Sequence, residues 1–460
     1  MKRKRVETDS IGPKKINIDK FWGAQTQRSL ENFKIVNEII PKEIIVAFGY
    51  QKKAAALANI KLGQLNKKIG NAIIKACNQI INLKLLNEFP LSVWQTGSGT
   101  QTNMNVNEVI SNYAIKLLKG KIGSKKPVHP NDHVNLSQST NDTFPTVMHI
   151  ACKHLINEKL FKSINKLIKE LENKTKKYNK IIKIGRTHTQ DATPLTLGQE
   201  FSGYLEQIKK NKIRLYNATK ELSYLAQGGT AVGTGINAPK KFDKVFCKYL
   251  SSLTNYKYFP SNNKFESIAA HDSMVNLSAA LNSIAVSLFK IANDLRFLAS
   301  RPRSGLGELL LPENEPGSSI MPGKINPTQI EALTMVCIQV MGNHTAITIS
   351  GSQGHFELNT YKPIIIYNNL QSINILSDSI NSFTKYCLKG IKINKKRIDK
   401  NLNNSLMLVT SLNKYLGYDK SAKIAKKAFK ENLSLKEAAK KLKLISEKDF
   451  DKIVDPKKMV

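Results

Sequence analysis

One loop combines the residue types that could remove a proton and hold the charge left behind. It reads Gly317-Ser-Ser-Ile-Met-Pro-Gly-Lys-Ile-Asn-Pro327 and so carries two serines, a lysine and an asparagine ahead of a helical segment. We expect Asn326 to cap that helix and Pro327 to be its first residue, which places Glu331 in its first turns. A lysine beside helix N-terminal amides suits a small carboxylate and would stabilise the charge formed when the adjacent carbon loses a proton. A flexible surface connection would have a similar composition, so both interpretations stay open.

The spacing of the glycines in this chain fits neither of two common nucleotide-binding motifs. A Walker A loop has about four residues between its glycines and Ser or Thr after its lysine. Here the two glycines enclose five residues, and Ile325 follows Lys324. Gly97-Ser-Gly99 and Gly233-Thr-Gly235 lack the third glycine and the strand-rich setting of a dinucleotide fingerprint. We therefore expect no nucleotide cofactor.

A second candidate is the histidine of a tight polar loop. Gly185-Arg-Thr-His188 places the Thr187 hydroxyl beside the imidazole, with Pro194 shortly before the next long helix. Histidine can act as a general acid or base near neutral pH. A structural histidine that caps a backbone carbonyl would have the same setting, so this alternative also stays open.

Two further loops are dense in hydroxyl and amide donors, at residues 97–105 and 137–142. Such donors can bind a carboxylate without another full charge. Ser, Thr, Asn and Asp are also the preferred N-caps of helices. The two roles can coexist, because the free amides of a helix N-terminus bind anions.

The sequence does not indicate a metal centre. His129 and His133 have the spacing of two helical ligands, but the intervening Pro-Asn-Asp predicts a turn rather than a helix. The cysteines lie far apart without a C-x-x-C pair, which argues against a zinc site or a disulfide framework and favours a reducing compartment. We expect the chemistry to come from side chains alone, with no metal and no cofactor.

The chain is strongly basic. Its 460 residues include 71 Lys and Arg against 35 Asp and Glu, a formal net charge of +36, which first suggests a nucleic-acid partner. However, aromatic residues make up only 7%, and the lysines are spread along the chain, as at Lys52-Lys53 and Lys395-Lys396, rather than gathered with stacking residues. We interpret them as a solvated surface and expect no nucleic acid, and a basic nucleic-acid-binding protein is the remote alternative.

The sequence also predicts the compartment. No uninterrupted apolar run approaches the roughly 18 residues that cross a bilayer, so we expect no membrane partner. The basic opening segment Met1-Lys-Arg-Lys-Arg5 is short and lacks the Ser-rich amphipathic pattern of a transit peptide. We expect a soluble protein of a bacterial cytoplasm.

The loops must be positioned by long helices. Between residues 274 and 299, apolar residues recur at alternating steps of four and three, at Leu277, Leu281, Ile284, Leu288, Ile291, Leu295 and Leu298. This heptad seam predicts one long helix. Residues 155–178 have a second amphipathic pattern, and 196–226, 328–349 and 364–388 are long and free of internal proline. Together they predict an all-α bundle of about five helices, whose seams could pack within one chain or in an oligomer core.

Three domains are expected. Residues 1–138 form an N-terminal mainly helical domain, 139–392 the central five-helix bundle, and 393–460 a small C-terminal helical domain. The last is expected because the chain turns to short Lys-rich helical patterns at 391–402, 422–431 and 435–444.

Taken together, the loops resemble those of a known family. The 317–327 loop resembles the signature of the aspartase/fumarase superfamily, and nearly the whole chain is similar to the class II fumarate hydratases. The other motifs that carry this resemblance are Phe21-Trp-Gly-Ala-Gln-Thr-Gln-Arg-Ser29, Trp94-Gln-Thr-Gly-Ser-Gly-Thr100, His129-Pro-Asn-Asp132, Gly185-Arg-Thr-His188, Gln227-Gly-Gly-Thr-Ala-Val-Gly-Thr-Gly235 and Pro312-Glu-Asn-Glu-Pro-Gly317.

The resemblance implies an activity and an assembly. The activity is the reversible hydration of fumarate to L-malate, a step of the tricarboxylic acid cycle, by acid–base catalysis through an aci-carboxylate intermediate. Such an enzyme is a carbon–oxygen lyase. The assembly is an all-α homotetramer whose long central helices form a common core and whose active sites each take loops from three subunits.

The resemblance also implies roles for individual residues. Ser318 would remove the C3 proton of malate, Lys324 and Asn326 would hold the carboxylate, and His188, supported by Glu331, would act on the water side. The positions that match substrate binding are Ser98, Thr100, Ser139, Thr140, Asn141, Thr187 and Ser319. Those that match a second, noncatalytic dicarboxylate site are Lys126, His129, Asn131 and Asp132.

Aspartate ammonia-lyase, of the same superfamily, is the nearer alternative. Aspartases generally have Ala where Gly323 stands and Gln where His188 stands, so both residues favour the hydratase. Thr140 points the other way, because fumarases usually have Ser there and aspartases Thr. Lys126 replaces the arginine usual at the second site, which turns a bidentate fork into a point charge.

Overall fold

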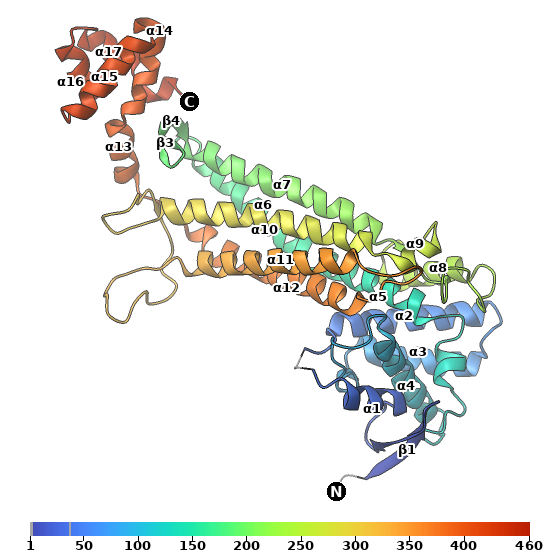
Figure 1. Cartoon of the computed structure of the whole chain (residues 1–460). Coiled ribbons are helices and arrows are strands. Elements are labelled where there is room, and N and C mark those ends of the chain that lie inside the picture. Colours follow the sequence, from blue (N-terminus) through green and yellow to red (C-terminus); the bar gives the residue numbers. More distant parts are fainter. Residues whose placement is uncertain (1–2, 36–37) are drawn as a thin grey trace. The chain divides into compact units, whose positions relative to one another are not determined.

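A computed structural model describes residues 3–35 and 38–460 (Figure 1). Met1 and Lys2 of the basic opening segment lie outside the described residues. The structure is 62% helical, which confirms the all-α class. The chain forms two compact units, which we describe separately. The first comprises Met1–Lys162, Lys212–Ala285 and Ile338–Ser377, and the second Ser163–Asn211, Val286–Cys337 and Asp378–Val460.

The first unit begins with a hairpin and four helices. Strands β1 (Lys4–Thr8) and β2 (Pro13–Asn17) pair antiparallel with Val6 opposite Lys15. The helices are α1 (Ala24–Asn32), α2 (Lys42–Lys61), α3 (Lys67–Ile81) and α4 (Thr100–Leu117). The side chain of Asn66 caps α3 by accepting from the backbone N–H of Lys68 and Ile69. Helix α2 packs against α3, and α3 against α4.

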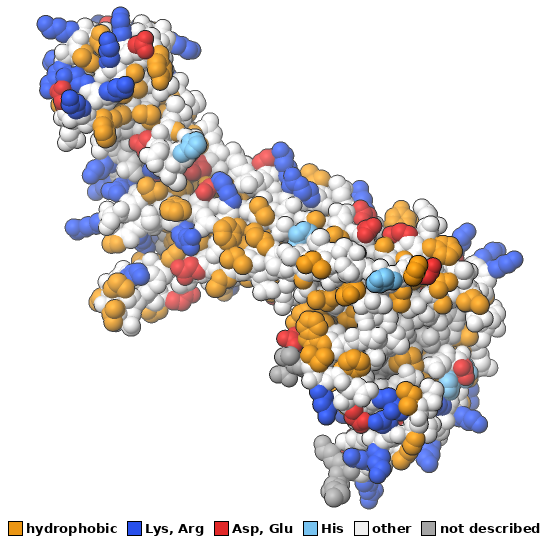
Figure 2. Space-filling view, in the orientation of Figure 1, with side chains coloured by type: hydrophobic (Ala, Val, Ile, Leu, Met, Phe, Trp, Pro, Cys, Tyr) orange, Lys and Arg blue, Asp and Glu red, His pale blue; other side chains and the backbone are white. Residues whose placement is uncertain are grey.

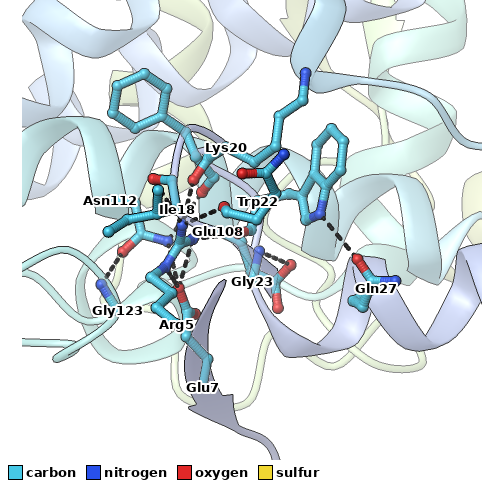
Figure 3. A network of polar contacts seen from close by, with 12 residues as sticks. Arg5, Glu7, Ile18, Lys20, Trp22, Gly23, Gln27, Glu108, Asn112 and Gly123 are labelled. Atoms are coloured by element: carbon cyan, nitrogen blue, oxygen red, sulfur yellow. Dashed lines mark hydrogen bonds and ion pairs between the residues drawn. The ribbon is translucent and has the colours of Figure 1, made fainter. Parts of the chain in front are cut away.

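A polar network holds the hairpin on α4 (Figure 3). The Arg5 guanidinium pairs with Glu7 at 2.7 Å. It also donates to the backbone carbonyls of Asn17, Lys20 and Trp22. Glu108 of α4 is buried and accepts from the backbone N–H of Gly23 at 2.8 Å and from the Thr26 hydroxyl at 2.6 Å. Because these carboxylates are paired or hydrogen-bonded, the start of α1 is fixed against α4.

The rest of the first unit surrounds α5 (Thr140–Leu155). It contains the helices α8 (Phe242–Thr254) and α9 (Lys264–Ala269) and the short parallel pair β5 (Tyr224–Leu225) and β6 (Phe259–Pro260). Helix α2 packs against both α5 and α8. Helix α5 also packs against α9, so its neighbours come from distant parts of the sequence.

Five long helices correspond to the five predicted segments. They are α6 (Phe161–Lys177), α7 (Leu197–Glu221), α10 (Asp272–Leu298), α11 (Thr328–Gly351) and α12 (Lys362–Tyr386). All seven residues of the heptad seam are buried. This confirms the prediction that they form the face by which α10 packs. The segment predicted from residue 155 begins as a π-helical turn, Ile156–Leu160, that joins α5 to α6.

Polar contacts connect neighbouring long helices within each unit. In the second unit, Tyr204 of α7 donates to Asp294 of α10 at 3.0 Å. In the first, Asn343 of α11 donates to Ser372 of α12 at 3.0 Å, and Ser278 of α10 contacts His344 of α11 at 3.0 Å. These partners satisfy polar groups that would otherwise be buried unpaired between apolar seams.

The second unit also contains two strand pairs and the C-terminal helices. The pairs are β3 (Ile182–Thr187) with β4 (Gln190–Thr196), and β7 (Leu309–Leu310) with β8 (Lys392–Ile393). The helices are α13 (Lys395–Asn404), α14 (Asn413–Leu416), α15 (Tyr418–Lys430), α16 (Leu435–Lys441) and α17 (Glu447–Ile453). Their apolar cluster includes Ile184 of β3. The three-domain boundaries at 138 and 392 stay a prediction.

Within residues 3–35 and 38–460, the helices α10 and α11 have the length and hydropathy of a membrane span. Half of the apolar window of α10 and 33% of that of α11 are buried inside the chain. Core helices of soluble proteins meet the same criterion, so the finding is weak evidence for a membrane.

Basic side chains are spread over the face that Figure 2 shows rather than gathered in one patch. Several pair with acidic neighbours one helical turn away, as Lys162 does with Glu158 and Lys395 with Asp399. Such exposed pairs each contribute only about 0.3–0.5 kcal/mol, so they are typical of a solvated surface.

Candidate active site

The first unit presents predicted site hydroxyls at the start of α4. Thr100 is the first residue of this helix, and its Oγ1 lies 2.8 Å from Oγ of Ser98 in the preceding loop. Both side chains are half-buried. The hydroxyl pair therefore lies beside the free amides of a helix N-terminus, which suits an anion.

A second group of predicted residues begins α5, where Ser139 and Asp142 form a capping box. Asp142 Oδ1 accepts from the Ser139 N–H at 3.0 Å, and Ser139 Oγ accepts from the Asn141 N–H at 3.2 Å. The box leaves Thr140 as the first helical residue between them. It confirms that this loop caps a helix, one of the two roles that the sequence left open.

The Gln227–Gly235 motif supports this helix start. The other oxygen of Asp142 accepts from the backbone N–H of Gly228 at 2.9 Å and of Thr230 at 3.0 Å. The Asn141 amide donates to the Ala231 carbonyl at 2.8 Å. Burial raises the pKa of Asp142 to about 6.

A buried lysine lies beneath α5, although the sequence placed it on the solvated surface. Lys52 of α2 is 0% exposed and donates to side-chain oxygens of Asn135 and Gln138. The surface prediction was wrong here because α2 is buried on several sides. The missed signal was its helical spacing, four residues after Phe48 and four before Ala56, both of which are buried.

The predicted second dicarboxylate site lies on one helical turn. His129 caps the π-helical turn Pro130–Val134, and its Nδ1 accepts from the N–H of Asn131 and Asp132 at 3.2 and 3.1 Å. The expected plain turn was wrong, because proline suits the first helical position and the histidine supplies the cap.

Basic residues around this turn are arranged differently from the prediction. A cavity of about 30 Å³ is lined by His129, Asn131 and Lys125, whereas Lys126 is not among its lining residues. Lys126 is exposed. The Asp132 carboxylate lies 3.2 Å from the His129 ring. Lys125 is therefore the lysine that lines this cavity, and its lining also includes the carboxylates of Glu7, Asp9 and Glu108.

In the second unit, the predicted His188 loop is a hairpin turn. His188 and Thr189 connect β3 to β4 with φ values of +54° and +62°, the backbone of a type I′ turn. His188 and Thr187 are exposed at its tip. The sequence predicts a loop at β3 and β4, because the long helical patterns on either side are the dominant signal.

Charged residues fix the base of this hairpin. Arg186 Nη2 lies 2.6 Å from Glu308 Oε1, and Lys183 Nζ lies 3.3 Å from Glu308 Oε2. Asn401 of α13 donates to the same carboxylate at 3.1 Å. Burial opposes the charged form of Glu308, but Arg186 and Lys183 outweigh it and lower its pKa.

The signature loop folds back on itself next to Ser318. A Cβ at Gly317 would lie 1.8 Å from the Lys324 carbonyl oxygen, so only glycine permits this close approach. The Asn326 amide donates to the Gly317 carbonyl at 2.5 Å and closes the loop. Ser318 Oγ accepts from the N–H of Ile320 at 3.3 Å and of Met321 at 3.0 Å.

This loop borders an open cavity of about 460 Å³. Ser318 and Lys324 line it, and Lys324 and the neighbouring Ser319 are exposed. One loop thus provides a hydroxyl that accepts from two backbone N–H groups and, beside the same cavity, the Lys324 ammonium. That set can stabilise negative charge on the hydroxyl oxygen and on a bound carboxylate.

The expected cap of α11 is wrong by one residue. The Pro327 carbonyl accepts from the N–H of Ile330 and Glu331, and the helix begins at Thr328. Pro327 is therefore the cap, because the Asn326 side chain is engaged in closing the loop. Glu331 lies in the first turn as predicted.

The structure brings some of the predicted site residues together on one loop. Ser318, Ser319, Lys324 and Asn326 share one loop, and the α4 and α5 hydroxyls belong to the other unit. In the part of the chain that the structure describes, no hydrogen bond or ion pair joins His188 to Ser318 or Glu331. Nor do the described residues include three or more His, Cys, Asp or Glu side chains placed to share a metal ion.

Comparison with known protein families gives two matches. Residues 12–342 match a lyase family model, and residues 408–460 match the model of the fumarase C C-terminus.

Individual relatives and solved structures match over almost the whole chain. The chain is 58% identical to the class II fumarate hydratase of Rickettsia bellii, over 99% of this chain and 98% of that one. It is 58% identical to the mitochondrial fumarate hydratase of Dictyostelium discoideum, over 99% and 94%. The crystal structure of class II fumarase from Schistosoma mansoni superposes with a TM-score of 0.98 at 44% identity, over 99% of each chain. A fumarate lyase:delta crystallin from Brucella melitensis gives 0.95 at 38%, again over 99% of each.

Proposed function

The chain belongs to the lyase family that includes the class II fumarate hydratases, and we propose that it catalyses the reversible hydration of fumarate to L-malate. It is an enzyme of the lyase class. The observation that carries the assignment of its chemistry is the signature loop, where Ser318 Oγ receives two backbone N–H donors and Lys324 and Asn326 lie in the same loop. The reaction is a step of the tricarboxylic acid cycle.

Ser318 acts as the base in the direction of malate dehydration. Its alkoxide oxygen takes the C3 proton, and the C–H electron pair moves onto the adjacent carboxylate to give the aci-carboxylate. A serine base needs strong local stabilisation, and the N–H groups of Ile320 and Met321 supply part of it. Lys324 and Asn326 would hold the carboxylate as its charge grows.

His188 acts on the opposite side of the substrate. The electron pair of the aci-carboxylate forms the C2–C3 double bond as the C2–O bond breaks, and the departing hydroxyl takes a proton from this side to leave as water. The type I′ turn holds the imidazole exposed at the hairpin tip, and Glu331 in the first turn of α11 would support its protonated form. Thr187 would contact the substrate beside it.

Gly323 supports the hydratase over the ammonia-lyase. Its φ is +79°, and an L-residue in the left-handed region costs roughly 1–2 kcal/mol. The conformation at position 323 therefore favours glycine, which fumarases have there, over the alanine that aspartases generally have.

The remaining predicted ligands have the chemistry to bind the substrate. Ser98, Thr100, Ser139, Thr140 and Asn141 would bind carboxylates at the starts of α4 and α5. A second dicarboxylate would lie near His129, Asn131 and Asp132, with Lys126 at its edge.

The active enzyme would be a homotetramer with each site built from three subunits. The functional side chains lie on separate loops of one chain, so further subunits could complete the site. The long helices expose apolar side chains that suit such a core, among them Phe297 (60% exposed) of α10 and Met335 (65%) and Ile349 (60%) of α11. Figure 2 shows apolar side chains over these helices. Light scattering should give about four times the 51.5 kDa chain mass.

The proposal also includes a cellular compartment and a division into three domains. A bacterial cytoplasm is supported by the bacterial class II relatives, although mitochondrial relatives are equally similar. Three domains, divided near 138 and 392, agree with a separate family model for the C-terminal residues 408–460.

One assay tests the activity. The ultraviolet absorbance of fumarate is followed with purified protein and no added cofactor, in parallel with a reaction that contains ammonium. Loss of fumarate in water alone is expected. Loss of fumarate only with ammonium would instead support the ammonia-lyase, as Thr140 suggests, because aspartases usually have Thr at this position.

A further inference from the structure

A partly buried chain of amide side chains connects Lys52 to the Thr140 hydroxyl. We propose that Asn103 is a positioning residue that holds the Thr140 hydroxyl as a hydrogen-bond donor to the substrate carboxylate, and that Lys52 fixes the orientation of Asn103. The inference rests on the proposed function, in which Thr140 binds the substrate. All of its residues belong to the first unit, where α2, α4 and α5 pack against one another (Figure 1).

The direction of the hydrogen bonds is set at Lys52. Its Nζ lies 2.9 Å from Asn135 Oδ1 and 3.0 Å from Gln138 Oε1. Burial lowers the pKa of Lys52 to about 7, but the amine has at least two N–H groups whether charged or neutral. In either state it donates to both amides, which must turn their oxygens toward it.

Three backbone carbonyls fix the same orientation independently. Gln138 Nε2 donates to the carbonyls of Val134 and Leu136 at 3.1 and 3.0 Å, and Asn135 Nδ2 donates to the Gln138 carbonyl at 3.2 Å. A carbonyl can only accept, so neither amide can flip without losing these bonds. Asn135 Oδ1 is thus an acceptor toward every neighbour.

Asn103 donates to both Asn135 and Thr140, so the orientation of Asn135 determines which atom of Asn103 faces Thr140. Asn103 is 0% exposed, and its Nδ2 lies 3.3 Å from Asn135 Oδ1 and 2.8 Å from Thr140 Oγ1. A flipped amide would place the Asn103 oxygen against the Asn135 oxygen, which is repulsive. Asn103 Oδ1 has no hydrogen-bond partner among the described residues, so its two N–H groups alone decide its orientation.

The consequence lies in the single hydrogen of the Thr140 hydroxyl. Because Oγ1 already accepts from Asn103, the hydrogen is directed elsewhere, and Thr140 Oγ1 makes no second hydrogen bond within residues 3–35 and 38–460. With Asn103 flipped, the hydroxyl would donate to it and be lost to a ligand. A carboxylate needs a donor, so the network selects the state of Thr140 that binds one.

The test compares two variants and their combination in steady-state fumarate hydration. Thr140→Val removes the hydroxyl and should raise KM about tenfold or more, since hydrogen bonds to charged groups are strong. Asn103→Asp accepts but does not donate at that position, so it should take the Thr140 hydrogen and raise KM similarly. In the double variant, KM should stay within about twofold of Thr140→Val alone, because Asn103 acts through Thr140.

A matched control separates positioning from stability. Asn105→Asp makes the same change two residues along α4, at a buried amide that donates to the Glu88 carbonyl. It should lower the thermal midpoint without changing KM. If Asn103→Asp does not assemble, Asn103→Ser replaces it, because a serine hydroxyl no longer dictates the direction and should still raise KM.

The outcomes distinguish this inference from the proposed function. A normal KM for Thr140→Val would remove Thr140 from the substrate site, and no turnover in the wild type would reject the activity itself. A raised KM for Thr140→Val with an unchanged KM for folded Asn103→Asp would overturn only the positioning role. So would independent, multiplying effects in the double variant.

Discussion

Arg186 and Glu308 form an ion pair with 2.6 Å between Nη2 and Oε1, in which the carboxylate is buried and the guanidinium, two residues from His188, is partly buried. Glu308 is 1% exposed and also contacts Lys183 and Asn401, so one carboxylate ties β3 to the start of β7 and to α13. The hairpin tip that presents the imidazole is therefore held from its base, and the pair links folding to the proposed chemistry.

We expect Glu308→Gln to lower both stability and turnover. The glutamine keeps the shape but leaves Arg186 without a charge partner, while Lys183 keeps Glu200 at 3.0 Å. Breaking a buried pair costs about 3–5 kcal/mol. The thermal midpoint should fall, and kcat should fall with it because His188 loses its support. Glu172→Gln is the control, since its pair with Lys209 is exposed and its loss should leave the thermal midpoint nearly unchanged. Equal midpoints for the two variants would contradict this role.

Ser318→Ala should abolish turnover without dissociating the proposed tetramer. The substitution removes the oxygen that we propose takes the C3 proton, and a lost acid–base group typically costs about 10²–10⁴ in rate. Fumarate absorbance measures turnover, and light scattering measures the assembly. Ser319→Ala, the exposed neighbouring serine, distinguishes the base from a second ligand by affecting mainly KM. Near-normal activity of Ser318→Ala would reject it as the base.

His188→Asn should lower kcat steeply, by about 10²–10⁴ for a general acid–base group. Asparagine tolerates the positive φ of +54° at this turn, so the hairpin should persist. Circular dichroism and the thermal midpoint check that it does. A change confined to KM would make His188 a binding residue only.

The sequence predicted the long helices better than the shape of the loops. The heptad seam of α10 is a regular pattern in one segment, and such local periodicity survives folding. By contrast, the burial of Lys52 depends on helices packed around α2, and the Glu308 contacts join segments more than ninety residues apart. The cap of α11 shifted because Asn326 reaches back nine residues to Gly317. These features arise from tertiary contacts, which residue spacing does not contain.

Lys52→Met should change how stability depends on pH. Burial lowers the Lys52 pKa from 10.5 to about 7, while Asp142 and Cys77 face it and act in the opposite direction more weakly. Between these values the unfolded chain binds a proton that the folded chain has released, so this group makes stability rise with pH. The slope is at most about 1.4 kcal/mol per pH unit, and the contribution is absent in the Lys52→Met variant.

Urea unfolding at one protein concentration, from about pH 6 to about pH 9, should show the wild type gaining stability over the variant above pH 7. Lys61→Met, at the exposed end of α2, controls for the loss of a surface lysine. Parallel curves for wild type and Lys52→Met would mean that Lys52 does not change its protonation on unfolding.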